Sequence, residues 1–485
     1  MSQIIEVTAR QGDPAETSAD TRVIGLFDGV DSGIDPVDKL VASGEIKASY
    51  KSSGVAHAHG KRFLAIGLGK AEEFATERAR VSGAVAASAA AGLGAKSISW
   101  TLPVEGDAAT TAGAIVEGTL LKAYKFDAYK SKDDDDEKKS GIEQLEVVAD
   151  TDLTDAVASA AIGANAVNAA RDLQNQPSNV ATPSYLADRA AAIAAETGNI
   201  EFDIYDRQWI ENKGMGAFAA VAQGTIEEPR LIVMRYNGAP DSDAPTLGFV
   251  GKAVTFDTGG ISLKPSGKME EMKFDMSGGA AVLEATGAIA KLGLPINLIS
   301  IVPSTENMPS GSAIKPGDIV TAYNGKTIEI DNTDAEGRLI LADALTYANE
   351  LGADRLVNLA TLTGAIIVAL GSTYAGLFSN DDDWAAQVEA AAESTGELGH
   401  RLPLHPEFAE LIKGKYADIT NAPAARKGSS ITAAEFLKNF VGETPWTHID
   451  IAGTAWDLGR PYVGNGASGF GVRLLIELAR KHGQR

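Results

Sequence analysis

The second half of the chain alternates apolar, β-branched runs with helical patterns, and this alternation constrains the fold more than any other feature. Five runs read as strands: Leu231–Tyr236, Leu247–Phe256, Asn297–Val302, Leu356–Ala360 and His448–Ile451. Helical patterns lie between strands over Ala280–Leu292, Leu339–Glu350 and Trp384–Ala392. Nearly continuous apolar strands that alternate with helices are typical of a parallel sheet covered on both faces. We therefore predict an α/β fold with a mainly parallel sheet flanked by helices, and reactive groups beyond the carboxyl ends of its strands.

The first part of the chain has the same character on a smaller scale. Short β-rich runs at Val23–Phe27 and Phe63–Gly67 alternate with an Ala-rich helical stretch near Ala84–Ala91. The block Lys132–Lys139, KDDDDEKK, concentrates like charge and is typical of a solvated loop. We expect a smaller N-terminal α/β domain that ends near this loop.

A long helix is predicted to join the two parts. Residues 154–174 read as one helix, and Thr182 is placed to cap a second helix that begins at Pro183. The expected organisation is an N-terminal α/β domain over residues 1–150, a connecting helix over 151–175 and a larger C-terminal domain over 176–485. A chain of 485 residues has the length for two or three domains.

Composition argues against several classes of function. The chain carries 43 Lys and Arg against 65 Asp and Glu, and its net charge of −22 repels phosphate backbones, which argues against general nucleic-acid binding. The absence of cysteine excludes disulfides, thiolate metal sites and a cysteine nucleophile. No apolar run reaches the ~18–20 residues of a membrane span, and the N-terminus lacks the features of a secretory signal. We expect a cytoplasmic protein with no membrane partner.

Motifs of other hydrolases and nucleotide enzymes are missing. The six histidines form no HExxH pair, no G-x-S-x-G elbow occurs, and no P-loop is present. His57 and a second histidine two residues on favour a polar surface strand over a metal site. His448, inside an apolar run, is expected to be a buried structural residue.

Three segments concentrate charged residues at junctions between elements. Lys252 and Asp257 lie on a hydrophobic run that leads into a glycine-rich turn, followed by Lys264; taken alone, an ordinary strand-edge lysine and turn aspartate are the simpler interpretation. Asp275 precedes a predicted helix, where a carboxylate either caps the helix or binds a metal, and capping is the more frequent role.

The third segment, Glu329–Arg338, is harder to explain without a cation. It crowds Asp331, Asp334 and Glu336 at one turn and adds Arg338, and carboxylates so close together repel unless a cation or water screens them. Together, the segments offer a set of four carboxylates and two lysines that suits Mn, Mg or Zn: Asp257, Asp275, Asp334, Glu336, Lys252 and Lys264. Two such ions ~3.5–4 Å apart would activate a shared hydroxide and polarise a carbonyl.

These segments resemble the leucyl aminopeptidases, also called cytosol aminopeptidases. The most specific match is NTDAEGR at Asn332–Arg338, and five further segments match: GKAVTFDTGGISLKP at Gly251–Pro265, KFDMSGG at Lys273–Gly279, ATLTGA at Ala360–Ala365, NQPSNVATP at Asn175–Pro183 and HIDIAGTAW at His448–Trp456. The similarity is strong over about 175–480 and loose over the first 150 residues. One departure is Asn358, where many relatives have an acid; this position is not a metal position and bears on local packing.

The resemblance implies a two-metal exopeptidase that releases N-terminal residues, with leucine favoured, by attack of a metal-bridging hydroxide. The ions would be Mn or Zn, with Mg or Co as alternatives. By motif position, Asp257 and Glu336 are expected to bridge both metals, Lys252 and Asp275 to complete the tighter site, and Asp334 to complete the more exchangeable one. A lysine ligates a metal only as a neutral amine, and two nearby dications would lower its pKa.

The resemblance also implies catalytic and substrate-binding roles and an assembly. Lys264 is expected to polarise the scissile carbonyl, and Arg338 to hold a bicarbonate ion that acts as general base. Thr361, Leu362 and Gly364 are expected to contact the substrate, a peptide with a free N-terminus. The family implies a homohexamer with the catalytic domains facing the interior.

Two other classes stay open at this point. Some members of the family also bind DNA through the N-terminal domain, although the acidity of this chain argues against it. A metal-dependent phosphoryl or amide hydrolase would use the same carboxylates, but the chain lacks a phosphate-binding loop. A catalytically inactive scaffold would require a lost ligand, and none of the expected positions is lost.

Overall fold

The computed structural model describes residues 5–58, 60–131, 141–241, 244–425 and 427–484, so the predicted charged loop at Lys132–Lys139 lies outside the described residues. The chain forms two compact units: unit 1 comprises Met1–Asn168 with Gly459–Gly464, and unit 2 comprises Ala169–Leu458 with Asn465–Arg485. Helix α4, Thr154–Asn175, contains the boundary between them, and its bounds agree with the predicted long helix.

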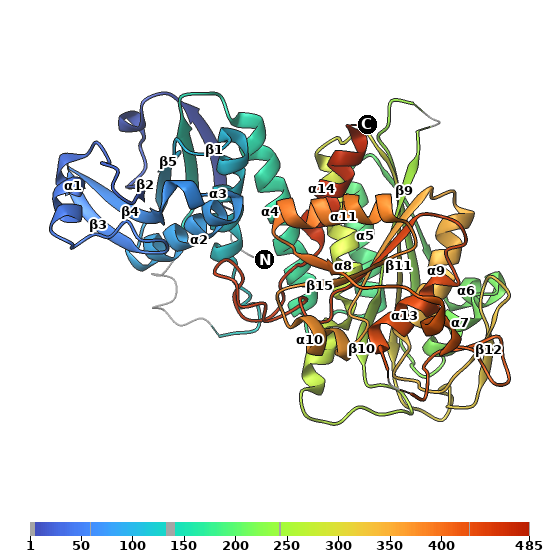
Figure 1. The fold of residues 1–485 in the computed structure, drawn as a ribbon. Helices are drawn as coiled ribbons and strands as arrows, with labels where there is room; N and C mark the ends of the chain where they lie inside the picture. Colours follow the sequence, from blue (N-terminus) through green and yellow to red (C-terminus); the bar gives the residue numbers. More distant parts are fainter. Residues whose placement is uncertain (1–4, 59, 132–140, 242–243, 426, 485) are drawn as a thin grey trace. The chain divides into compact units, whose positions relative to one another are not determined.

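Unit 1 is an α/β layer structure built on a six-stranded sheet in the order β1-β6-β5-β2-β4-β3 (Figure 1). All neighbours are parallel except β3 and β4. The strands are β1 Glu6–Gln11, β2 Thr21–Phe27, β3 Ser53–Ala58, β4 Lys61–Gly69, β5 Ser97–Thr101 and β6 Gln144–Ala149. The helices are α1 Asp35–Ala42, α2 Thr76–Gly92 and α3 Ala108–Ala123.

Glycines let α2 and α3 pack with their backbones in contact. A Cβ added at Gly83 would meet the carbonyl oxygen of Ile115, and one added at Gly118 would meet that of Arg80. Asp107 begins α3 by accepting a hydrogen bond from the Thr110 amide, as an N-cap does. The Ala-rich stretch of the sequence is therefore half of a tightly packed helix pair.

Unit 2 is built on a nine-stranded sheet whose central strands β18, β14, β9 and β11 are parallel. Strands β15 and β8 join this centre in antiparallel orientation, so the sheet is mainly parallel, as predicted. The strands are β7 Ile200–Tyr205, β8 Arg230–Asn237, β9 Thr246–Gly251, β10 Ala253–Asp257, β11 Asn297–Asn307, β14 Arg355–Ala360, β15 Ala375–Ser379, β16 Gly399–Arg401 and β18 Trp446–Asp450. A separate small sheet contains β12 Ile319–Thr321, β13 Thr327–Glu329 and β17 Ile419–Thr420.

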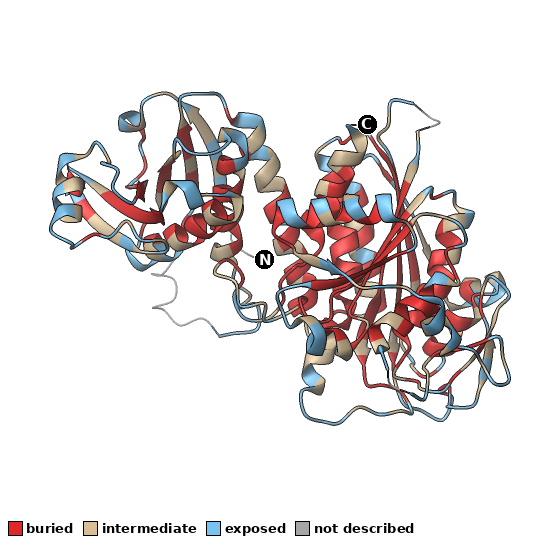
Figure 2. Ribbon diagram, viewed as in Figure 1, coloured by how far each residue is buried: buried red, intermediate tan, exposed pale blue. Residues whose placement is uncertain are grey.

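Helices cover both faces of this sheet (Figure 1). Helix α8 packs against α5 and α14, and α9 packs against α7 and α13, while both α8 and α9 contact β9, β11 and β14. The central strands and the helix faces that meet them are buried (Figure 2). The helices are α5 Pro183–Thr197, α6 Arg207–Lys213, α7 Gly216–Ala222, α8 Ser277–Lys291, α9 Gly337–Glu350, α10 Gly364–Leu370, α11 Asp382–Thr395, α12 Pro406–Glu410, α13 Ser429–Lys438 and α14 Val472–Gly483.

Helix α5 begins as the sequence predicts. Its first residue is Pro183, and the Thr182 hydroxyl accepts a hydrogen bond from the Tyr185 amide at 3.3 Å. The helix ends at Gly198, whose φ of 71° is favourable for glycine.

The structure divides one predicted strand into two, and the interruption lies at Lys252, a residue of the candidate site. The run Leu247–Phe256 is not a single strand: β9 ends at Gly251 and β10 begins at Ala253. At the interruption, the Lys252 amide donates to the Leu359 carbonyl, and the Lys252 carbonyl accepts from the Gly279 amide. Apolar residues flank Lys252 on both sides, so the pattern gave no sign of the interruption, although β9 and β10 pair with β11 in one register across it.

Candidate active site

The charged residues singled out in the sequence come together at the carboxyl ends of the central strands of unit 2. Lys252 lies between β9 and β10, Asp257 ends β10, and Thr361 follows β14. Asp275 lies in the 3-10 helix Met269–Met276 that leads into α8, and Glu336 immediately precedes α9. This is the edge at which parallel α/β sheets gather reactive groups.

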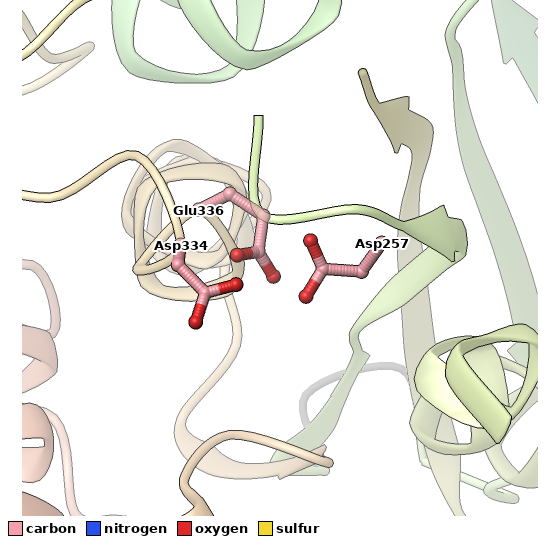
Figure 3. Close-up of side chains that lie close together, drawn as sticks. All are labelled: Asp257, Asp334 and Glu336. Atoms are coloured by element: carbon pink, nitrogen blue, oxygen red, sulfur yellow. The ribbon is translucent and has the colours of Figure 1, made fainter. Parts of the chain in front are cut away.

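Three carboxylates form the centre of the cluster. Asp257, Asp334 and Glu336 each offer an oxygen, and these oxygens all lie within 4.8 Å of one another (Figure 3). Asp257 and Glu336 are buried, whereas Asp334 is partly open. Asp331, which the sequence places beside them, accepts a hydrogen bond from the Thr420 hydroxyl and stands apart from the cluster.

Lys252 is buried among these acids. Its Nζ lies 2.8 Å from Asp275 Oδ2 and 2.8 Å from Glu336 Oε1, and it donates to the Thr361 carbonyl at 3.0 Å. Burial alone would lower the pKa of Lys252, but the surrounding carboxylates outweigh burial and raise this pKa. A Cβ at Gly337 would collide with the Lys252 side chain, so the glycine of the NTDAEGR segment makes room for the lysine.

Lys264 reaches the same carboxylates from the glycine-rich loop. Its Nζ lies 2.6 Å from Asp257 Oδ2 and also pairs with Asp334. Gly259 and Gly260 have φ of 88° and 69°, which favours glycine, and a Cβ at Gly259 would meet the Asp334 carboxylate. The loop therefore needs its glycines to bring Lys264 to the acids.

The carboxylates respond to burial and to one another. Burial raises the pKa of Asp257 and, more strongly, that of Asp275. Burial and the charges of Asp257 and Glu336 raise the pKa of Asp334 to about 6. For Glu336, the two lysines outweigh burial and lower the pKa. Added positive charge in this pocket would stabilise the ionised forms of these carboxylates.

Two buried asparagines support the cluster, and sequence reasoning missed both. Asn307, at the end of β11, donates to Asp257 Oδ1 at 2.8 Å, to the Thr333 carbonyl at 3.1 Å and to Glu336 Oε2 at 3.4 Å. Asn421 holds the NTDAEGR segment through its side chain, which accepts from the amides of Asp331 and Asn332. Neither asparagine lies in a motif, so only the fold identifies them.

Arg338 is buried with part of its guanidinium unsatisfied. Its Nη1 donates to the Asn421 carbonyl at 2.5 Å, while Nε has no hydrogen-bond partner among the described residues. Burial lowers the pKa of Arg338 to about 10. An unpaired buried N–H is unfavourable, so this position suits an anion or another acceptor.

A cavity of about 1120 Å³ opens over the cluster. Thr361, Leu362 and Gly364 line it together with the charged residues, as do apolar side chains such as Met272 and Trp456. The Thr361 hydroxyl donates to Asp275 Oδ1 at 2.7 Å. The structure thus brings every residue expected at the site into or beside one cavity.

Sequence profiles decide the family. The profile of the cytosol aminopeptidase family, catalytic domain, matches residues 168–476, and the profile of the family's N-terminal domain matches residues 30–133. The chain belongs to the cytosol aminopeptidase family. It is therefore a metal-dependent aminopeptidase, a hydrolase that acts on peptides.

Relatives of this family match the chain along nearly its whole length. The probable cytosol aminopeptidases of Solibacter usitatus (strain Ellin6076) and Roseiflexus castenholzii (strain DSM 13941 / HLO8) are 46% and 43% identical, and each alignment covers 98% of this chain and 99% of the relative. A mutant of tomato leucine aminopeptidase superimposes with a TM-score of 0.88 at 33% identity, covering 99% of this chain and 97% of that one. The bottromycin maturation enzyme BotP in complex with Mn has a TM-score of 0.87 at 35% identity, covering 96% of this chain and 100% of its own.

Other expectations concern residues beyond the acidic cluster. His448 is buried, as expected, and its Nδ1 lies 2.9 Å from the Asn358 side-chain nitrogen, while the Trp446 indole donates to the Asn358 oxygen at 2.7 Å. Burial lowers the pKa of His448 to about 3, so it is a neutral partner for an amide.

His57 is exposed on β3. Among the described residues, no helix combines the length and the apolar character that a membrane crossing requires.

Proposed function

We propose that this aminopeptidase holds two divalent ions, Mn or Zn with Mg or Co as alternatives, and releases N-terminal residues with leucine favoured. The observation that supports this most directly is the cluster of Asp257, Asp334 and Glu336 oxygens within 4.8 Å of one another. Asp257 and Glu336 would bridge the two ions. Lys252 and Asp275 would complete one position, and Asp334, with its own carbonyl, would complete the other.

The donor set fits such ions. Carboxylate oxygens with one amine nitrogen suit hard and borderline divalent metals. Burial, together with the charges of neighbouring carboxylates, raises the pKa of Asp257 and Asp275, and divalent cations would stabilise their ionised forms. When bound, the ions supply Lewis-acid polarisation of the scissile carbonyl and a nucleophilic water at neutral pH.

Lys264 is proposed to bind the carbonyl oxygen of the scissile peptide and to stabilise the negative charge that develops on it. Its Nζ reaches the edge of the cluster and, with 21% of its side chain exposed, faces the cavity. The charges of Asp257, Glu336 and Asp334 outweigh its burial and raise the pKa of Lys264, so it stays cationic at neutral pH.

Arg338 is proposed to hold a bicarbonate ion that serves as general base. The buried Nε without a partner and the position of Arg338 on the cavity wall support an anion at this place. Activity assayed in bicarbonate-free buffer should fall and should recover on addition of bicarbonate. An Arg338→Met variant should show no such recovery, and equal recovery in both proteins would refute the role.

A free α-amino group is proposed to be required because it binds beside the acidic cluster. The cavity carries Asp257, Asp275 and Asp334, which attract an ammonium or ligate through the same ions as an amine. Leucine would find an apolar wall at Leu362, Met272 and Ala452. Nucleic acid is not expected in this acidic environment.

Self-assembly into a homohexamer in the cytoplasm is also proposed. Helix α10 supports a protein partner because its apolar side chains face outward: Val368 is 90% exposed and Ile367 is 40% exposed. Both belong to the helix that begins at Gly364, and Ile367 also lines the cavity. Analytical ultracentrifugation should give a sixfold mass, and Val368→Glu should lower it; a monomeric wild-type protein would refute the assembly.

The deciding experiment strips the enzyme of metal and resupplies Mn, Zn, Mg or Co singly, with leucine anilide and its acetylated form as substrates. We expect activity to return with at least Mn or Zn and only for the free amine. A metal-stripped enzyme that stays fully active would refute the two-metal proposal. Equal cleavage of the acetylated substrate would refute the requirement for a free N-terminus.

A further inference from the structure

Asp450 is a buried carboxylate that the roles above leave unused. It is the last residue of β18, and in the parallel pairing of β18 with β14 it stands opposite Ala360, the residue before Thr361. Its side chain has no access to solvent, and among the described residues no basic side chain lies within ion-pairing distance of it. The Arg338 guanidinium interacts with Asp450 electrostatically from beyond that distance, and a buried carboxylate with no direct ion pair is retained where its hydrogen bonds have a use.

Every hydrogen bond that Asp450 accepts comes from the turns after β14 and β18. Oδ1 accepts from the amides of Leu362 at 3.1 Å, Thr363 at 3.4 Å and Ala452 at 3.3 Å. Oδ2 accepts from the Thr363 hydroxyl at 2.6 Å, and that hydroxyl is also 2.6 Å from the Ser430 hydroxyl of α13. The carboxylate therefore fixes the residues that immediately follow Thr361.

One peptide unit links this carboxylate to the candidate metal ligands. The Leu362 N–H and the Thr361 C=O belong to the same planar trans peptide, in which the two groups point in opposite directions. The N–H donates to Asp450, and the C=O accepts from Lys252 Nζ at 3.0 Å. The Thr361 hydroxyl donates to Asp275 at 2.7 Å, so the same residue orients both members of one proposed metal position.

We propose that Asp450 is a positioning residue that, through the Thr361–Leu362 peptide, orients Lys252 and Asp275 for one of the two metal ions. This inference rests on the proposed two-metal function. An amine that ligates through its lone pair still carries N–H bonds, and the Thr361 carbonyl directs the lone pair by accepting one of them. A carboxylate on the N–H side polarises the peptide and strengthens that carbonyl as an acceptor.

The test measures Mn²⁺ binding to the metal-stripped full-length protein by electron paramagnetic resonance of the free ion. Partners that orient metal ligands typically contribute about ten- to hundredfold to affinity. Asp450→Ala should weaken one of two Mn²⁺-binding events by about that factor and leave the other nearly unchanged. Asp450→Asn keeps an oxygen for the Leu362 amide but loses the charge, so it should weaken the same event by a smaller factor.

Asp343→Asn is the matched control. Asp343 is equally buried and accepts only from backbone amides, those of Phe218 at 2.8 Å and Tyr323 at 2.7 Å among them, and it touches no candidate ligand. Its variant should bind Mn²⁺ as the wild type does. Should Asp450→Ala fail to fold, Asp450→Asn carries the test alone.

The outcomes separate this inference from the proposed function. Two Mn²⁺-binding events in the wild type that persist unchanged in folded Asp450→Ala or Asp450→Asn would overturn the positioning role alone. Equal weakening of both events would overturn the assignment to one position. A wild-type protein that binds no Mn²⁺, Zn²⁺, Mg²⁺ or Co²⁺ would overturn the two-metal proposal and this inference with it.

Discussion

Replacing Lys252 by methionine tests whether the acids of the cluster depend on this one buried cation. Methionine keeps the length of the side chain and removes its charge. Lys252 is 3% exposed and lies 2.8 Å from both Asp275 and Glu336, which are 9% and 2% exposed. Removing one partner of a buried ion pair costs about 3–5 kcal/mol. The Thr361 carbonyl also loses a donor, which adds about 1–3 kcal/mol, so we expect a loss of about 4 kcal/mol or more.

The loss should grow with pH. Without the lysine, the pKa of Asp275 rises further above that of the unfolded chain, and the pKa of Glu336 loses the cation that helps to lower it, so both groups take up protons more readily. A carboxyl group whose folded pKa is raised loses stability as pH increases past its unfolded pKa. The difference in the free energy of unfolding between wild type and Lys252→Met should therefore be larger at pH 8 than at pH 5.

Urea unfolding of the metal-stripped proteins, followed by tryptophan fluorescence, measures this difference. Four of the five tryptophans lie in unit 2: Trp209, Trp384, Trp446 and Trp456. Lys213→Met is the control, because Lys213 pairs with Glu350 where both side chains are partly exposed, and such a pair contributes about 0–1 kcal/mol. A Lys252→Met protein as stable as the wild type at pH 8 would refute the reasoning.

Three further predictions concern single residues. Asp334→Ala should abolish peptide hydrolysis and lower the bound metal measured by elemental analysis, with an unchanged circular dichroism spectrum; full metal content would contradict its role as a ligand. Lys264→Ala should keep the metals and lower kcat more than it raises KM, and full turnover would contradict its role at the carbonyl. Burial raises the pKa of Asp343 to about 7. Unfolding free energy should therefore fall as pH rises from about 4 to 7, and Asp343→Asn should flatten this part of the pH profile; an unchanged slope would argue against a raised pKa.

The sequence predicts most of the fold because apolar periodicity reports burial directly. The strands at the centre of unit 2 and α8, α9 and α11 lie where the pattern of hydrophobic residues indicates, with ends that differ by a few residues. The pattern of hydrophobic residues does not show which strands pair with each other or in which orientation. Strand β15 runs antiparallel beside β18, and no local signal distinguishes such a neighbour from a parallel one.

The candidate site likewise contains residues that the sequence identifies and residues that only the fold identifies. Its charged residues stand out in the sequence, because carboxylates and lysines inside apolar segments are costly without a partner. Asn307 and Asn421 do not stand out, and Asp450 lies in the matched segment His448–Trp456 without a role of its own, although each makes several hydrogen bonds to the loops that carry the charged residues. These three act at sequence separations of 26 to 90 residues, which only the folded chain brings together.

The interruption between β9 and β10 at Lys252 lies against the start of α8. At Lys252 the backbone bonds to Leu359 of β14 and to Gly279 at the start of α8, and close packing leaves no space for a Cβ at Gly251, Gly278 or Gly279. These three glycines therefore let α8 approach the strand and bring Asp275 to the lysine.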